Sequence, residues 1–149
     1  MKINNKTTKT LRYILGALFA FATLNAFGGG YYGLAGAEGV PLEWLEGSPF
    51  DSYFIPSLFL MIVLGGSFLT ASIANFASWK RARVISMLTA LLAFIWIAVQ
   101  VSIIGYISWM QPATVTFGVI VLAIAWVMPE KDKLTRTQNH SCHISNMSA

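Results

Sequence analysis

The sequence contains few charged residues, and its longest apolar stretches contain none. Charged residues make up 11% of the 149 residues, whereas a soluble domain carries about 25%. The first apolar stretch covers residues 13–32, and three more follow it without an acid or a base. Ion-coupled transporters and voltage sensors usually place an ionisable residue at membrane depth. The sequence therefore argues against both of these classes of protein.

Histidine and cysteine are also scarce, with two histidines and one cysteine, and both are confined to the C-terminal tail. The single cysteine, Cys142, cannot form an internal disulfide, and a quinone-linked thiol oxidoreductase would need a pair. A membrane cytochrome would need histidines on its helices as haem ligands, but His140 and His143 lie outside every apolar stretch. Together with Cys142 they would form only a weak, unselective metal site. We therefore expect no cofactor, no catalytic residue and no metal site.

Apolar residues are abundant and arranged in long runs. Hydrophobic residues make up 56% of the chain, and roughly 20 of them in a row suffice to cross about 30 Å of hydrocarbon. The fold class that we expect is all-α, an integral membrane bundle of four transmembrane helices within residues 11–129. The predicted spans cover residues 11–30, 53–78, 84–107 and 113–128.

Lysine and arginine lie in three blocks, which are expected to mark one side of the membrane. They are Lys2, Lys6, Lys9 and Arg12, then Lys80, Arg81 and Arg83, then Lys131, Lys133 and Arg136. The predicted outer loop, residues 33–52, carries only acids. Because cytoplasmic loops are enriched in lysine and arginine, both termini are expected in the cytoplasm. The net charge of +4 then reflects orientation and anionic lipid, and no nucleic-acid partner is expected.

The two ends of the chain lie outside the predicted bundle. Residues 1–10 form a short cytoplasmic segment, and residues 130–149 are polar without periodicity, which predicts a disordered cytoplasmic tail. The apolar run of residues 13–32 is longer than the 7–15 residues of a usual signal-peptide core. We therefore interpret it as a retained first helix, with cleavage as the minority alternative.

Small residues recur at a spacing of four along the first three predicted helices, which lets helix backbones approach closely in a membrane. Short links, residues 80–83 and 108–112, predict that the second and third helices, and the third and fourth, are antiparallel neighbours. The run of glycines at 28–30 is expected to weaken the outer end of the first helix. The small-residue rows are Ala22, Ala26 and Gly30; Gly66, Thr70, Ala74 and Ser78; and Ser86, Ala90, Ala98 and Ser102.

Uncharged polar residues within the spans suggest an intramembrane polar layer. At 1.5 Å per residue, Asn25 falls roughly 6 Å and Gln100 roughly 7 Å outside the midplane, with Thr116 at a similar height. We expect these three to meet inside the bundle, where they either hydrogen-bond between helices or line a pocket for a small ligand. Trp96, one turn from Gln100, either fills the core or stacks on such a ligand.

The outer loop offers a second candidate surface. Residues 41–47 read either as one or two helical turns on the membrane surface or as an irregular loop with an interfacial tryptophan. The acids form a negative patch without matching a metal-loop spacing. The candidate outer-face interaction surface consists of Glu43, Trp44, Glu46, Asp51 and Trp109.

Two segments carry a resemblance to a known group of proteins. They are WLEGSPFDSYFIP at residues 44–56, followed by the glycines at 65–66, and IWIAVQ at 95–100, followed by IGYISWMQP at 104–112. Together they resemble an uncharacterised family of small bacterial membrane proteins with four helices. The resemblance implies the same architecture and a bacterial inner membrane. It implies no activity, but it directs attention to the two outer loops, which could pack together as a cap.

Three functional hypotheses follow. The leading one is a non-enzymatic membrane protein that acts through helix–helix contacts, either as an accessory subunit of another membrane protein or as a homo-oligomer. The second is an oligomeric pore or transporter for a small neutral or lipophilic solute. The third and weakest is an envelope or lipid-modifying enzyme that uses the outer-loop carboxylates, since no base, nucleophile and orienting partner occur together. In each case the lipid bilayer is the surrounding medium.

Overall fold

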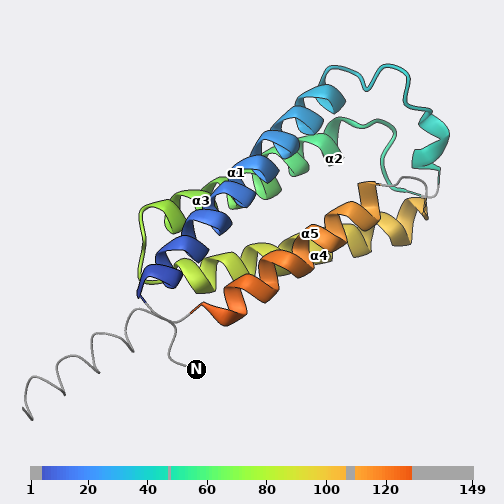
Figure 1. Ribbon diagram of the computed structural model, residues 1–149. Coiled ribbons are helices and arrows are strands. Elements are labelled where there is room, and N and C mark those ends of the chain that lie inside the picture. The colour runs from blue at the N-terminus through green and yellow to red at the C-terminus, as the bar shows by residue number, and fades with distance from the viewer. Residues whose placement is uncertain (1–4, 47, 107–109, 129–149) are drawn as a thin grey trace, which may run out of the picture.

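All regular structure in the described part of the chain is helical. The computed structural model describes residues 5–46, 48–106 and 110–128 (Figure 1). The predicted tail, residues 130–149, and Trp109 therefore lie outside the described residues, as do residues 1–4 of the predicted N-terminal segment. The helices are α1 (Asn5–Leu34), the 3₁₀ turn η1 (Leu42–Leu45), α2 (Phe54–Phe59), the π-helical η2 (Leu60–Gly65), α3 (Gly66–Phe76), α4 (Ala82–Ile104) and α5 (Met110–Val127).

Four helical segments are long and apolar enough to cross a membrane, as predicted. They are Lys6–Leu34, Phe54–Phe76, Ala82–Ile103 and Met110–Val127. The first is longer than expected at both ends, because α1 already begins at Asn5 and continues through the three glycines at 28–30 to Leu34. A glycine costs a helix only about 1 kcal/mol, whereas an unpaired backbone group in lipid costs several. The apolar medium therefore keeps the helix intact where its sequence is weak.

The second span is one continuous rod with an irregular middle. Its turns are α-helical in α2, π-helical in η2 and α-helical again in α3. Pro56 stands in the first turn of α2, where its missing N–H costs nothing. A π turn holds more residues than an α turn, so the buried face of α2 does not continue into α3 in the usual register.

The four spans form two helix hairpins. Helix α1 packs along the rod of α2, η2 and α3, while α4 packs along α5, and α3 joins the pairs by contacting α4 (Figure 1). The link between α3 and α4 closes in a tight cap, in which Ser78 adopts a left-handed conformation and Trp79 N–H bonds to the Ala74 carbonyl at 2.9 Å. The second and third spans are therefore antiparallel neighbours, and so are the third and fourth, as the short links predict.

Glycines on α1 create the closest contact between helices. A Cβ added to Gly30 would lie 2.6 Å from Met61 Cβ and 3.1 Å from the Ser57 carbonyl oxygen. A Cβ added to Gly33 would overlap the Ser57 hydroxyl. The expectation that small residues on the first helix permit close approach is confirmed at Gly30 and at the buried Ala26.

Three phenylalanines join the two hairpins in the middle of the bundle. Phe19 of α1 lies 6.2 Å from Phe68 of α3 and 6.4 Å from Phe117 of α5 between ring centroids. The Phe68 and Phe117 rings are 6.4 Å apart in an edge-to-face arrangement, which aromatic rings favour. Phe19 is fully buried. Because lipid is as apolar as this core, shape and dispersion rather than escape from water hold it together.

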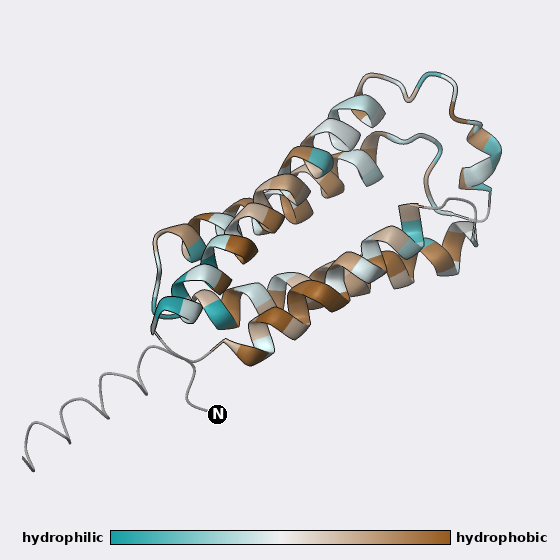
Figure 2. Ribbon diagram, in the orientation of Figure 1, coloured by the Kyte–Doolittle hydropathy of each residue, from teal (hydrophilic) through white to brown (hydrophobic). Residues whose placement is uncertain are grey.

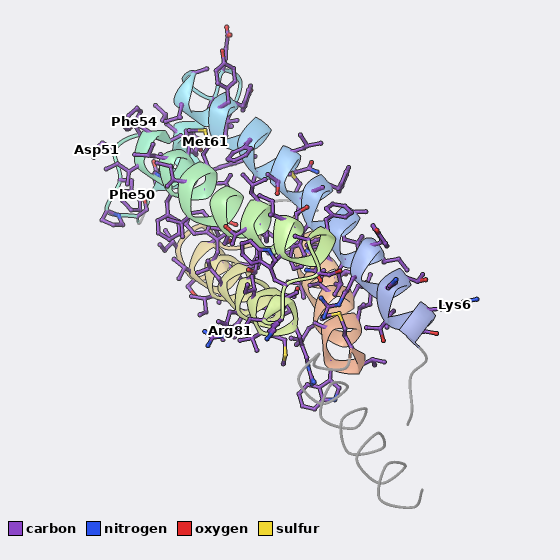
Figure 3. All side chains as sticks on the ribbon, turned by 90° about the vertical axis from the view of Figure 1, so that its left-hand side faces the viewer. Lys6, Phe50, Asp51, Phe54, Met61 and Arg81 are labelled. Atoms are coloured by element: carbon purple, nitrogen blue, oxygen red, sulfur yellow. The ribbon has the colours of Figure 1, made fainter. Side chains whose placement is uncertain are left out.

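The two ends of the bundle differ in charge. We call the end that holds the start of α1, the α3–α4 link and the end of α5 the basic end, and the opposite end the acidic end. Lys6 and Arg81 lie at the first, and Asp51 lies at the second (Figure 3). Hydrophobic residues dominate the helices between the two ends (Figure 2). Among the described residues, this segregation agrees with the first two basic blocks and the acidic loop of the sequence.

The small-residue rows on the second and third spans pack only in part. Ala74 is buried, but Thr70 is exposed, and a Cβ on Gly66 would meet nothing within 4 Å. On α4 the row is likewise buried at one end and exposed at Ala98 and Ser102. A step of four residues turns a helix by about 40° beyond a full circle, so a long row winds from one face to another. Within the bundle, each of these two rows therefore packs against a neighbouring helix over only part of its length.

Candidate functional site

The loop at the acidic end is fastened by two tyrosine hydroxyls. Tyr32 donates to the Glu38 carbonyl, and Tyr53 donates to the Pro41 carbonyl at 2.6 Å. Burial raises the pKa of Tyr53 above its ordinary value. Pro41 directly precedes the short 3₁₀ turn η1, which confirms the helical alternative for this segment.

The candidate outer-face surface is open to its surroundings. Glu43, Glu46 and Asp51 are all exposed, and 38% of Trp44 is exposed. Trp109 lies outside the described residues, so the idea of a cap made by the two outer loops stays a prediction. Among the described residues, no three His, Cys, Asp or Glu side chains gather closely enough to hold a metal ion. The acids therefore stand as separate charges on a fastened loop.

The predicted polar layer does not form inside the bundle. Asn25 is exposed, and its amide donates back to the Phe21 carbonyl of the same helix at 2.8 Å. Thr116 is also exposed and donates to the Pro112 carbonyl at 2.8 Å. Gln100 is half-buried. The expectation that the three meet in the interior is wrong, because two of them satisfy a donor on their own helix and face outward.

Trp96 packs against another aromatic ring. Its ring lies nearly parallel to that of Phe59, with centroids 5.0 Å apart and an interplanar angle of 16°. Trp96 is half-buried at the edge of the buried core. This stacking supports the core-packing interpretation, since Phe59 occupies one face of the ring.

A polar cluster buried between α1, α3 and α4 escaped the sequence interpretation. Asn75 is 1% exposed and donates to both the Ala71 carbonyl and the Ser86 hydroxyl at 2.8 Å. Ser72 donates across to the Gly16 carbonyl of α1 at 2.9 Å. Asn75 follows Ala71 by four residues and Ser72 by three, and this helical spacing is the sequence pattern that could have predicted its place on the buried face of α3.

Arg12 is the second feature that sequence reasoning missed. By sequence it belongs to the first basic block at the membrane surface, but the structure buries all but 2% of its side chain, inside the first span. Its Nη1 donates to the Trp79 carbonyl at 3.1 Å. A cation suits this place, because the negative pole of the α3 helix dipole lies there. Arg12 precedes Gly16 and Phe19 by four and seven residues, which puts it on the buried face of α1.

Gln111 closes the α4–α5 connection. It is 7% exposed, and its amide nitrogen donates to the Gly105 carbonyl at 3.0 Å. Gly105 has a φ of 72°, a conformation that glycine adopts without strain. The pair ends α4 at Ile104 and starts α5 at Met110, both three residues earlier than predicted.

The apolar spans, the paired hairpins and the separated charges decide the broad class. The chain is a multi-pass membrane protein. Comparison with family models, with curated proteins and with solved structures finds no match to it. Its class therefore depends on its own four spans, and the resemblance to small bacterial four-helix proteins stays a prediction.

Proposed function

We propose that this chain is a non-enzymatic protein of a bacterial inner membrane that acts through helix–helix contacts, as an accessory subunit or a small homo-oligomer. One observation carries the proposal: the small-residue row on α3 begins on the outer surface of the bundle. Gly66 has open space where a side chain would lie, and Thr70 one turn later is exposed. Such a row is the kind of surface that a second membrane helix can approach closely.

The neighbours of this row are suited to the same role. Ile62 and Ile73, on the turns before and after it, are 60% and 47% exposed. Together the four residues form an exposed, largely apolar surface with no side chain at Gly66. In lipid this surface gains little from burial alone, so association depends on close backbone packing at Gly66.

The orientation that we propose follows from charge. Lysine and arginine are retained on the cytoplasmic side during insertion, so the basic end is assigned to the cytoplasm and the acidic end to the periplasm. Both termini are then cytoplasmic. The bacterial inner membrane is supported by the resemblance of residues 44–56 and 95–112 to small bacterial proteins.

The non-enzymatic part of the proposal rests on residue types at the acidic end. The loop of residues 33–52 contains acids but no histidine, cysteine or lysine. Hydrolysis or group transfer on an envelope substrate needs a nucleophile and a base held by an orienting partner. The three exposed carboxylates Glu43, Glu46 and Asp51 supply no such set.

Replacing Gly66 with leucine tests the proposal. We expect the wild-type chain to form a stable complex in mild detergent, either with itself or with one co-purifying membrane protein. Gly66→Leu should weaken that complex at least tenfold, about 1.4 kcal/mol, because the added side chain holds the partner helix away. Native mass spectrometry measures the fraction of complex across a dilution series.

Gly28→Leu is the matched control. A Cβ on Gly28 also meets nothing within 4 Å, but its neighbours Leu24 and Tyr31 are large and each 72% exposed, so they already hold a second helix away. This variant should assemble like the wild type. A wild-type particle that is strictly monomeric and has no partner would contradict the proposal, as would equal effects of the two substitutions.

A further inference from the structure

Arg12 has an unused hydrogen-bonding edge. A guanidinium is a planar fork of five N–H donors, and here Nη1 alone reaches a partner, the Trp79 carbonyl. Nε and Nη2 are buried and make no hydrogen bond. These two nitrogens lie on the same edge of the fork and point their N–H bonds in parallel. That geometry fits two oxygens of one carboxylate or phosphate.

The described residues contain no acid that could pair with this edge. Of the six acidic residues, four lie in the loop at the acidic end, and Glu130 and Asp132 belong to the tail beyond the described residues. The basic end instead gathers more positive charge, including Lys80 and Arg81 directly after Trp79. Figure 3 shows Lys6 and Arg81 at this end. The surroundings therefore favour an anion that comes from outside the described bundle.

The depth of Arg12 matches a lipid headgroup. It lies eight residues from the middle of the 29-residue span Lys6–Leu34, which is about 12 Å along the helix axis. The hydrocarbon layer ends about 15 Å from the midplane. An arginine side chain at this depth can extend toward the headgroups while its stem stays in apolar surroundings.

We propose that Arg12 binds the phosphate of an anionic lipid through its Nε and Nη2 edge at the basic end of the bundle. Nη1 keeps its bond to Trp79 and fixes the plane of the fork. Lys80 and Arg81 add attraction for a negatively charged headgroup, because they follow Trp79 in the chain. The edge is covered by protein in this structure, so the phosphate reaches it when that cover parts while Nη1 stays bonded to Trp79. Arg12 thereby ties the α3–α4 link to one lipid molecule.

The experiment uses the full chain in mild detergent, with phosphatidylglycerol as the probe and phosphatidylcholine and inorganic phosphate as comparisons. Native mass spectrometry measures lipid binding, and thermal unfolding measures stabilisation. We expect phosphatidylglycerol to bind the wild type at least tenfold more tightly than phosphatidylcholine and to raise its unfolding midpoint. Inorganic phosphate at equal concentration should raise it less, because it brings no acyl chains.

Three variants locate the site. Arg12→Gln should remove the preference for phosphatidylglycerol, whereas Arg81→Gln, an exposed base at the same end, should keep most of it. Arg12→Lys retains the charge and so the fold, but it has no paired edge, and we expect about tenfold weaker binding. Should Arg12→Gln fail to fold, Arg12→Lys decides the question.

Two results would overturn the proposal. One is that Arg12→Lys binds phosphatidylglycerol as tightly as the wild type does and that Arg12→Gln, if it folds, does so too. The other result has two parts. The double variant Glu130→Gln, Asp132→Asn lowers the unfolding midpoint as much as Arg12→Gln does, and phosphatidylglycerol does not change the midpoint of the wild type. The second result would assign the edge to a carboxylate of the chain's own tail.

Discussion

Replacing Gly30 with leucine should separate α1 from the second span and destabilise the bundle by about 3 kcal/mol. Overpacking a well-packed core typically costs 1–3 kcal/mol, and this site is at the upper end because the clash involves the main chain. Even a methyl group would lie 3.1 Å from the Ser57 carbonyl oxygen and 3.2 Å from Met61 Cα. These atoms cannot move without moving the helix. Denaturation with SDS in mixed micelles, followed by tryptophan fluorescence, measures the loss.

Gly28→Leu provides the control for this substitution as well. It adds the same side chain two residues away on the same helix, where open space receives it. Leucine is the better helix former by up to about 1 kcal/mol, so this variant should be as stable as the wild type or slightly more stable. If both leucine variants unfold alike, close packing of α1 on the second span is not what stabilises the hairpin.

Replacing Phe19 with alanine should lower the free energy of unfolding by about 2–4 kcal/mol, because it leaves a cavity where the two hairpins meet. Phe19 is fully buried and touches the rings of both Phe68 and Phe117. Truncating a buried phenylalanine to alanine in a water-soluble core costs 3–5 kcal/mol. In lipid the transfer part of that cost is smaller, whereas the cavity part remains. The same SDS denaturation measures the change.

Phe21→Ala is its matched partner. Phe21 stands two residues along α1 and is 65% exposed, so lipid fills the space that its ring leaves. We expect the free energy of unfolding to change by less than about 0.5 kcal/mol, as it does for most substitutions of exposed residues in other proteins. Equal losses at Phe19 and Phe21 would mean that the aromatic contact does not join the hairpins.

The sequence could predict that the chain has four spans, that they are helical and that charge separates to the two ends. Each of these features depends on a property averaged over many residues. A run of 20 apolar residues has few alternatives to a helix in lipid. The helix ends were less predictable. Packing and the apolar medium carried α1 through three glycines, and Gly105 ended α4 early.

Which face of each helix is buried was harder to predict, because in a membrane both faces are apolar. Asn25 illustrates the difficulty: a polar residue in a span was expected to point inward, but a bond to its own helix satisfied one donor and let it face out. The π turn of η2 alters the register of the second span, and no pattern of residues in the sequence predicts this turn. Arg12 was missed because a base near the start of a span was taken for a surface charge.

Labelling of single cysteines tests the four-span account most directly. With Cys142 replaced by serine, Glu43→Cys and Arg81→Cys report on the two ends of the second span, which lies between them. In intact bacterial cells, a membrane-impermeant maleimide should label the cysteine at 43 at once and the cysteine at 81 only after the inner membrane is permeabilised. Labelling of both positions from the same side of the membrane would contradict the account.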